Sequence, residues 1–348
     1  MTSWRLPIHL PFFPMEAKSV SEIPEGPEWQ YEPKWDGFRC VAFRDGPAVE
    51  LQSKAGQSLT RYFPELAAAL EGLKPDRFVL DGEIIVAVGQ KLSFDDLLQR
   101  IHPAASRVAK LAKETPAQLV VFDFLVDEDG RSLVSAPLTK RREKLEAFAN
   151  KYLAENRSFL VSPATTDVKV ARQWLRTMRG QLDGLVAKSR SAPYAPGERA
   201  MQKIKNLRTA DCVVGGFRYG SKSKLVGSLL LGLYDAAGLL HHVGFTSSMP
   251  AESRPALTRK LEKIVKPPGF TGRAPGGPSR WSSERSGEWQ PVRPELVVEV
   301  QYDHFTSGRF RHGTKLVRWR PDKAPSQCRM DQVEVRTKSP LALLRKSA

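Results

Sequence analysis

The sequence predicts an α+β domain followed by a small β-barrel domain, and three observations support this prediction. The chain has 348 residues, which is enough for about two domains with a sizeable core. Strand patterns alternate with amphipathic helices in the first part, whereas short strands predominate in the second. The pattern changes around 206–211, which is therefore the expected hinge. We expect domains at residues 1–207 and 208–348.

The elements of the first domain follow from hydrophobic periodicity and from turn residues. Apolar stretches bounded by turn residues predict antiparallel strands at 38–43, 48–51, 78–80, 84–86, 119–126, 182–188 and 201–205. Apolar residues that recur on one face predict helices at 63–73, 139–153 and 167–178. Asp167 is the expected N-cap of the third helix. Asp81-Gly82-Glu83 is expected to form a turn between two of the strands.

The second domain has the pattern of a small β-barrel of the OB type. Short strands are predicted at 212–217, 228–234, 239–245 and 296–302, with one helix at 251–265. Residues 267–294 are rich in Pro, Gly, Ser and Arg, so we expect a long loop there.

The charge of the chain predicts a polyanionic partner. The formal net charge is +16 and the isoelectric point is about 9.8. Nucleic acid is the better candidate than a membrane, because no apolar run approaches the roughly 20 residues of a spanning helix. The N-terminal residues do not resemble a signal peptide. The scattered Cys40, Cys212 and Cys328 fit neither a disulfide framework nor a zinc site, so we expect a protein of the reducing cytoplasm. With nucleic acid as the expected partner, we expect it to be associated with the nucleoid.

The most informative segment reads K-x-D-G-x-R and runs from Lys34 to Arg39. A lysine can attack phosphorus once its charge is removed, and neighbouring Asp36 and Arg39 can hold phosphate and sugar. Gly37 allows a tight turn beside a ligand. This segment predicts that Lys34 carries a nucleotide as a phosphoramidate. The motif alone is also compatible with a charged surface turn.

Further segments suit the handling of a nucleotide. Glu83 can bind Mg²⁺ or accept a hydrogen bond from a ribose hydroxyl. The ring of Phe122 can stack on a base, although it could equally be ordinary core. Lys203 and Lys205 fall on one face of a strand, where they repel each other unless an anion lies between them. A second carboxylate, Asp183, precedes Lys188 in a similar segment.

Together these residues resemble the ATP-dependent DNA ligases of the covalent nucleotidyltransferase superfamily. The size and layout are similar to the minimal bacterial ligase C type, over about residues 14–323. The family motifs occur in order, at 34–39, 53–56, 81–83, 122–123, 183–188, 201–205 and 320–323. Two positions depart from the family pattern. Lys54 replaces an arginine, which weakens a bidentate grip on phosphate, and Asp183 replaces a glutamate with a longer side chain.

The resemblance implies an adenylation (nucleotidyltransferase) domain, an OB-fold domain and a three-step sealing of 5′-phosphate/3′-hydroxyl nicks through lysyl-AMP on Lys34. It implies ATP as cofactor and Mg²⁺ or Mn²⁺ held by Glu83 and Asp183. The implied nucleotide-binding residues are Glu32, Arg39, Lys54, Glu83, Phe122, Lys188, Lys203, Lys205, Arg320 and Lys323. Neighbouring cations (Lys188, Lys203 and Lys205) and the bound metal are expected to lower the pKa of Lys34. Glu32 is expected to accept a hydrogen bond from the adenine amino group and so to select ATP over GTP.

The implied partner is nicked double-stranded DNA, with other repair proteins as further partners of a monomer. Candidate DNA contacts are Arg39, Arg208, Arg218, Lys222 and Lys224, with a loop around Arg273, Arg280 and Arg285. An RNA ligase or a GTP-using capping enzyme is the alternative, although the R-x-D-K ending favours a DNA ligase. A non-catalytic basic OB-domain protein is a third possibility, which covalent adenylation would exclude.

Overall fold

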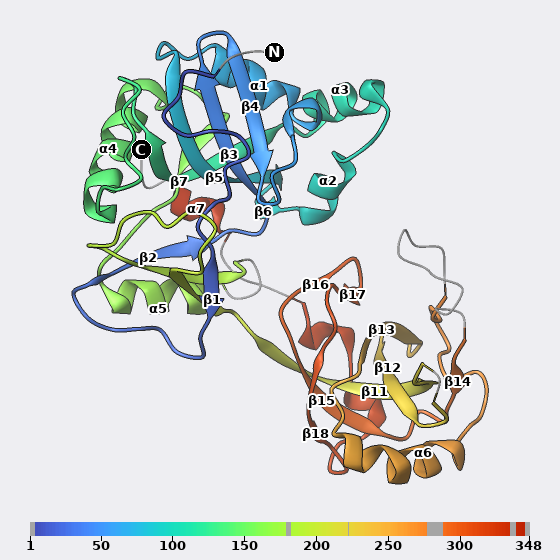
Figure 1. Ribbon diagram of the computed structural model, residues 1–348. Helices are drawn as coiled ribbons and strands as arrows, with labels where there is room; N and C mark the ends of the chain where they lie inside the picture. Colours follow the sequence, from blue (N-terminus) through green and yellow to red (C-terminus); the bar gives the residue numbers. More distant parts are fainter. Residues whose placement is uncertain (1–3, 179–181, 222, 277–287, 335–338, 345–348) are drawn as a thin grey trace. The chain divides into compact units, whose positions relative to one another are not determined.

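The computed structural model describes residues 4–178, 182–221, 223–276, 288–334 and 339–344 (Figure 1). The chain divides into two compact units. The first comprises Met1–Asn206 together with Thr337–Ala348, and the second comprises Leu207–Arg336. The predicted boundary lies one residue from this division. The expected second domain ran to residue 348, whereas the structure groups the C-terminal segment with the first unit.

A large sheet forms much of the first unit. Its strand order is β4-β3-β5-β7-β8, and β6 pairs with the end of β5. The strands are β3 (Phe38–Asp45), β4 (Ala48–Ser53), β5 (Arg77–Val88), β6 (Lys91–Leu92), β7 (Ala117–Val126) and β8 (Phe159–Val161). The predicted strands of this sheet pair antiparallel, as expected. Strand β7 runs parallel to β8, a strand that the sequence analysis did not predict.

Helices pack against the large sheet, and their apolar faces explain why. The helical elements are η1 (Thr60–Tyr62), α1 (Pro64–Glu71), α2 (Phe94–Gln99), α3 (Ala105–Glu114) and α4 (Leu138–Tyr152). Leu66 and Leu70 of α1 share one buried cluster with Leu145 and Phe148 of α4 and with residues of the sheet. The helix predicted at 63–73 and the one predicted at 139–153 are confirmed, with slightly shorter bounds.

A small sheet forms the rest of the first unit. Its order is β1-β10-β9-β2, with strands β1 (Ala17–Ser19), β2 (Trp29–Lys34), β9 (Gly184–Ser189) and β10 (Met201–Lys205). Strand β1 runs parallel to β10, and the other pairs are antiparallel. Helix α5 (Val168–Thr177) packs on this sheet through Trp174. Its predicted cap is confirmed, because the side chain of Asp167 accepts a 2.7 Å hydrogen bond from the amide of Lys169.

The turn predicted at Asp81-Gly82-Glu83 is wrong, because these residues lie inside the continuous strand β5. Glycine suggested a turn, but here it serves close packing. A Cβ atom on Gly82 would lie 2.7 Å from the carbonyl oxygen of Val120 on the neighbouring strand. The pairing with β7 shifts register at this point. The irregularity alters the register beside Glu83 without ending the strand.

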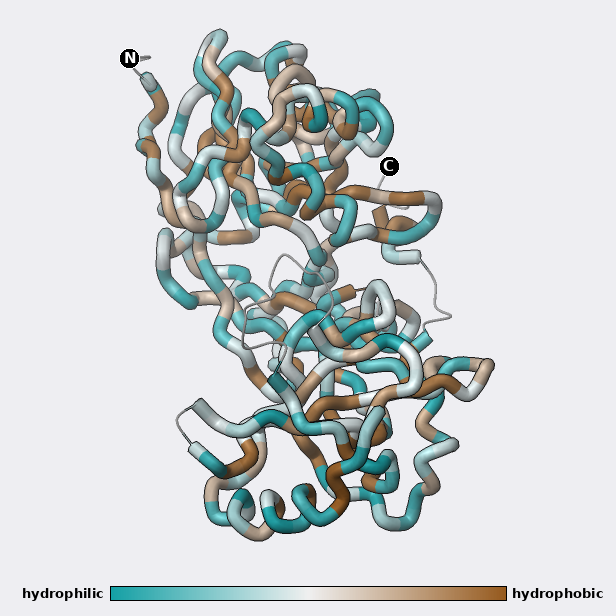
Figure 2. The backbone as a smooth tube through the Cα atoms, turned by 90° about the vertical axis from the view of Figure 1, so that its right-hand side faces the viewer, coloured by the Kyte–Doolittle hydropathy of each residue, from teal (hydrophilic) through white to brown (hydrophobic). Residues whose placement is uncertain are grey.

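The second unit is built around an antiparallel sheet of order β13-β12-β11-β15-β18, consistent with an OB fold. The strands are β11 (Arg208–Tyr219), β12 (Val226–Tyr234), β13 (Leu240–Thr246), β14 (Gln290–Pro291), β15 (Val297–Tyr302), β16 (Phe305–Thr306), β17 (Arg309–Phe310) and β18 (Lys315–Trp319). The helical elements are η2 (Ala251–Ser253), α6 (Arg254–Glu262), η4 (Pro325–Gln327) and η5 (Met330–Gln332). Hydrophobic stretches alternate with hydrophilic ones along the chain (Figure 2).

Regular structure resumes within residues 206–211, the segment expected to be the hinge, whose role as a hinge stays a prediction. Strand β11 begins at Arg208 and pairs with β15 along its first residues, including Arg208 with Tyr302. Asn206 and Leu207 alone therefore separate β10 from β11.

The described C-terminal residues end in a short helix, α7 (Leu341–Leu344). In Figure 1 this red helix lies beside β7 and β2 within the first unit. Leu341 and Leu344 share a buried cluster with residues of β5 and β7, which is why this segment groups with the first unit. Among the described residues, no helix is long and apolar enough to cross a membrane.

Candidate active site

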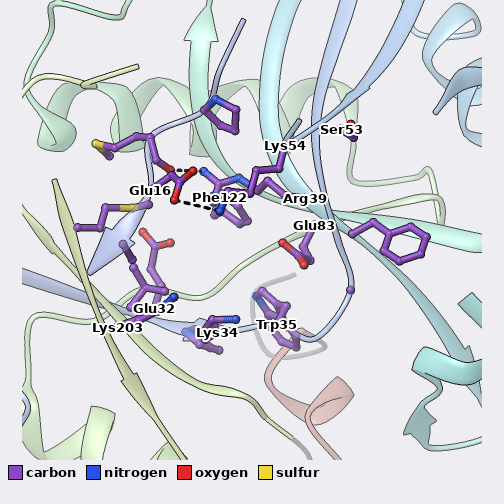
Figure 3. A pocket seen from close by; sticks show the side chains of 18 of the residues that line it. Glu16, Glu32, Lys34, Trp35, Arg39, Ser53, Lys54, Glu83, Phe122 and Lys203 are labelled. Carbon is purple, nitrogen blue, oxygen red and sulfur yellow. Dashed lines mark hydrogen bonds and ion pairs between the residues drawn. The ribbon is translucent and has the colours of Figure 1, made fainter. Parts of the chain in front are cut away.

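A cavity of about 540 Å³ opens in the first unit where the large and small sheets meet (Figure 3). Its size is in the range of small-molecule and cofactor sites. The structure brings eight of the predicted site residues together in its lining: Glu32, Lys34, Arg39, Lys54, Glu83, Phe122, Lys188 and Lys203. The lining also includes Glu16, Trp35 and Ile101, which the sequence analysis did not select.

Lys34 lies at the end of β2, directly opposite Gly184 on β9. The backbone amide of Asp183 donates a 3.1 Å hydrogen bond to the carbonyl oxygen of Lys34. The Asp183 carboxylate forms an ion pair with Lys34 Nζ. Gly184 has a φ of +148°, and a Cβ atom there would lie 1.9 Å from the carbonyl oxygen of Ile204. Only glycine fits this position, so the turn that places Asp183 beside Lys34 depends on it.

The pKa of Lys34 differs from the sequence-based expectation. Burial lowers it, but Asp183, Glu83 and Asp36 raise it, and their effect prevails, so the pKa lies above its ordinary value. The expected lowering by neighbouring lysines is therefore wrong for this state of the protein. The causes of the rise are three carboxylates, with that of Asp183 also hydrogen-bonded to the amine. Lys34 is consequently held as a cation, which must lose its proton before it can act as a nucleophile.

Glu83 occupies a second acidic position in the cavity. Burial raises its pKa to about 7, although Lys34 and Arg39 lower it in part. A carboxylate with such a pKa changes charge near neutral pH. Glu83 can therefore act either as a ligand or as a proton acceptor in this range.

The donor set is suited to a magnesium ion that also binds substrate. Among the described residues, no group of three or more His, Cys, Asp or Glu side chains is arranged to hold a metal ion by itself. Mg²⁺ usually uses one or two protein carboxylates together with substrate phosphates and water. Glu83 and Asp183, both of which act electrostatically on Lys34, provide two such carboxylates. These residues therefore fit the implied ion.

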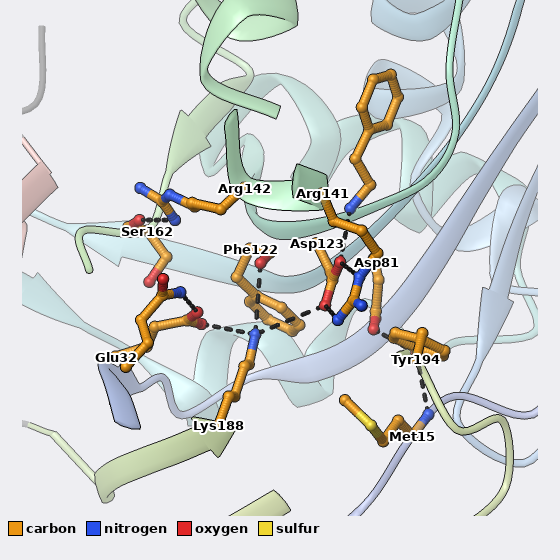
Figure 4. A network of polar contacts seen from close by, with 12 residues as sticks. Met15, Glu32, Asp81, Phe122, Asp123, Arg141, Arg142, Ser162, Lys188 and Tyr194 are labelled. Carbon is orange, nitrogen blue, oxygen red and sulfur yellow. Dashed lines mark hydrogen bonds and ion pairs between the residues drawn. The ribbon is translucent and has the colours of Figure 1, made fainter. Parts of the chain in front are cut away.

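Arg39 is held by Asp81 rather than projecting freely into the cavity. Its Nε and Nη2 atoms donate to the two carboxylate oxygens of Asp81 at 2.6 and 2.5 Å. Burial lowers the pKa of Arg39, but Asp81 raises it overall. The hydroxyl of Tyr194 donates to the same carboxylate at 2.6 Å and accepts from the amide of Met15 at 2.9 Å (Figure 4).

Lys188 lies at the centre of a second buried network, also drawn in Figure 4. Its Nζ atom lies 2.8 Å from Glu32 and 3.9 Å from Asp123. Arg141 binds Asp123 through two of its nitrogens, at 2.7 and 3.1 Å. Arg39 and Lys188 each lie 4.7 Å from the ring centre of Phe122. The Glu32 carboxylate is thus already paired with Lys188, while its predicted hydrogen bond with adenine stays a prediction.

Lys54 is paired with a residue from the N-terminal segment. Its Nζ atom lies 3.0 Å from Glu16, which also lies 3.8 Å from Arg199. The hydrogen bond with Lys54 lowers the pKa of Glu16. Burial lowers the pKa of Lys203, as do Lys34, Lys205 and Lys54. Glu16 is therefore a carboxylate whose pKa is lowered by three cations, Lys54, Arg199 and Lys203. No local motif predicts this arrangement.

The remaining predicted residues lie outside this cavity lining. Lys205 follows Lys203 on β10 and acts on its pKa. In the second unit, Asp211 pairs with Arg320 at 2.9 Å and with Lys323 at 2.5 Å. The predicted roles of Arg320 and Lys323 in binding the phosphates of ATP stay predictions.

The predicted DNA-binding residues of the second unit are only partly described. Arg208 lies 4.7 Å from the ring centre of Tyr302. Arg218 lies on β11, Lys224 is exposed, and Arg273 donates to the carbonyl oxygen of Gly308 at 2.5 Å. Lys222, Arg280 and Arg285 lie outside the described residues.

Comparison with known proteins decides the family. The model of the ATP dependent DNA ligase domain matches residues 14–205, and the model of the ATP dependent DNA ligase C terminal region matches residues 222–323. The chain belongs to the ATP-dependent DNA ligases. This ligase is 44% identical to DNA ligase C2 of Mycolicibacterium smegmatis over 348 residues, which covers 94% of the chain and 96% of the relative.

Two further comparisons agree with this assignment. The ligase is 44% identical to DNA ligase C of Mycobacterium tuberculosis over 347 residues, covering 95% of the chain and 96% of the relative. A solved structure from a study of Lig E DNA ligases superposes with a TM-score of 0.52 at 18% identity, covering 88% of the chain and 99% of that structure. The structural likeness at this low identity shows the shared fold.

Proposed function

We propose that this ligase seals nicks in duplex DNA through a lysyl-AMP intermediate on Lys34. The observation that carries the proposal is the position of Lys34 in the cavity, ion-paired with Asp183 and electrostatically coupled to Glu83. In the first step the lone pair of Nζ forms a bond to the α-phosphorus of ATP. The bond to pyrophosphate breaks, pyrophosphate departs as the leaving group, and the proton that Nζ loses passes to solvent water. AMP then passes to the 5′-phosphate of the nick, and the 3′-hydroxyl displaces it.

The cations of the cavity support this step by orientation and by electrostatic stabilisation. Lys188, Lys203 and Lys54 line the same cavity as Lys34, so a bound triphosphate would meet positive charge on several sides. Phe122 lines it too and offers an apolar face for the base. When the nucleotide binds, Lys188 would turn part of its charge from Glu32 towards the phosphate. The Glu32 carboxylate would then be available to accept a hydrogen bond from the adenine amino group.

Glu83 and Asp183 would hold a divalent cation, which supplies positive charge that favours a neutral Lys34 amine and stabilises the departing pyrophosphate. Because the same two carboxylates now raise the pKa of Lys34, neutralising them lowers it. The charge state of Lys34 is thereby coupled to the loading of the site.

We propose nicked double-stranded DNA, in repair, as the substrate. The excess of 54 Lys and Arg over 38 Asp and Glu supports a polyanionic partner. Relatives named as multifunctional non-homologous end joining DNA repair proteins share 31% identity over 308 residues with this chain. We propose that the ligase acts as a monomer at the nucleoid.

Incubation with α-labelled ATP and Mg²⁺, followed by a denaturing gel, tests the proposal. We expect a labelled band with ATP but not with GTP, and no band in Lys34→Ala or in Lys34→Arg, which keeps the charge but not the nucleophile. Chasing the adenylated protein with nicked DNA or nicked RNA then tests the substrate. A band that persists in both variants would exclude Lys34 as the nucleophile.

A further inference from the structure

The C-terminal helix α7 lies beyond the part of the chain that matches the ligase family models, which ends at residue 323. It nevertheless forms part of the first unit. Leu341 and Leu344 are only 7% and 6% exposed, whereas Ala342 between them faces outward. The helix therefore has one buried apolar face and one exposed face, which is the pattern of a docked element.

The apolar cluster that contains Leu341 and Leu344 also contains residues that are close in sequence to Lys34 and Glu83. Its members include Trp35, Ile85 and Phe122. Trp35 follows Lys34 directly in the chain, Ile85 follows Glu83 by two residues, and Phe122 lines the cavity. In Figure 3 the faint red ribbon of α7 lies next to the Trp35 side chain, at the edge of the cavity.

The side chain of Trp35 is fixed from two sides. Its Nε1 atom donates a 2.9 Å hydrogen bond to the hydroxyl of Ser162. The rest of the indole is buried, with 3% of the residue exposed, in the cluster that contains Leu341 and Leu344. Because Trp35 and Lys34 share a peptide bond, a shift of the indole moves the backbone that carries the nucleophile.

We infer that α7 is a positioning element that holds Lys34 in register with the nucleotide by packing on Trp35. This inference rests on the proposed role of Lys34. Removing the two leucines leaves a cavity into which neighbouring side chains relax. A displacement of about 1 Å at a reacting group costs about 10²-fold in rate. The first step of the reaction depends on Lys34, whereas closure of an already adenylated nick does not use Lys34 as a nucleophile.

The double variant Leu341→Ala/Leu344→Ala in the full chain tests this. We expect the single-turnover rate of lysyl-AMP formation at saturating ATP to fall about tenfold to hundredfold. We expect the ATP concentration for half-maximal rate and the rate of sealing a pre-adenylated nick to change less than about threefold. Leu341→Met/Leu344→Met should restore the first step, because methionine fills a similar volume. Ala342→Gln on the exposed face is the matched control.

The outcomes separate the possibilities. An unchanged rate of lysyl-AMP formation would overturn the inference, and so would an equal loss in both reactions, since that indicates general destabilisation. Labelling of Lys34→Ala at the wild-type rate would instead exclude the proposed nucleophile, and the inference with it. Melting temperatures of all variants, measured in parallel, confirm that each is folded.

Discussion

Asp183 and Lys34 are joined twice, by a backbone hydrogen bond of 3.1 Å and by a side-chain ion pair. The backbone bond fixes the distance between the two strands, and the ion pair keeps the lysine charged. The same contact therefore places the proposed nucleophile and holds it in its charged form.

Replacing Asp183 with Asn should shift the pH profile of lysyl-AMP formation to lower pH. The ion pair raises the pKa of Lys34, so the amide variant holds the amine as a cation less strongly. The maximal rate should fall about 10²-fold, because a ligand of the proposed cation site is lost. Single-turnover rates between about pH 6 and pH 9 measure both effects. Asp167→Asn, at the cap of α5, is the control, and an unchanged midpoint would contradict the prediction.

Glu83→Gln should stabilise the fold increasingly as the pH rises. Burial raises the pKa of Glu83 to about 7, so its contribution to stability is present at low pH and lost as the pH rises through about 7. Glutamine stays neutral throughout. Between about pH 5 and pH 8 the difference in unfolding free energy should grow by on the order of 2 kcal/mol. Urea unfolding measures it, with Glu143→Gln on the exposed face of α4 as control. A difference that does not vary with pH would argue against a raised pKa.

Glu16→Gln should strengthen the binding of ATP. Glu16 places a negative charge beside Lys54 and Arg199 at the cavity, where phosphates of the nucleotide are expected. Its removal should lower the dissociation constant about threefold to tenfold, and less at high salt because exposed charges are screened. Titration with ATP in the Lys34→Ala background measures binding without reaction. Glu25→Gln, whose ion pair with Arg172 is exposed, should bind as the unmodified chain does.

Arg141→Met should destabilise the protein by about 3–5 kcal/mol, because it leaves a buried carboxylate without its main partner. Arg141 and Asp123 are each only 1% exposed and are joined by two hydrogen bonds. Urea unfolding measures the change. The exposed Lys140→Met on the same helix should change stability by less than about 0.5 kcal/mol. Similar values for the two variants would show that the buried pair contributes little.

The cavity residues that come from short linear motifs could be predicted from the sequence. Lys34, Glu83 and Phe122 each lie in a segment whose residue types suit one task, and the structure brings the three into one cavity lining. The charge of Lys34 could not be predicted, because it depends on which ions surround it. The motifs suggested lysines as its neighbours, whereas carboxylates dominate.

Partners from segments without a motif could not be predicted. Tyr194 donates a hydrogen bond to Asp81, which is 113 positions away in the sequence, and Arg141 donates to Asp123, which is 18 positions away. Nothing local marks these side chains, since their roles arise from tertiary packing. The wrong prediction at Gly82 has a similar origin. Glycine is typical of turns, and only the neighbouring strand shows that Gly82 allows the backbone of Val120 to lie close to it.

The return of the chain to the first unit makes the second unit an inserted domain. The polypeptide crosses once after Asn206 and again before Leu341. Because Leu341 and Leu344 are buried in the first unit, the second unit is continuous with the first at both of its chain ends, and a deletion of the C-terminal residues would remove apolar surface from the first unit and leave the core of the second unit intact.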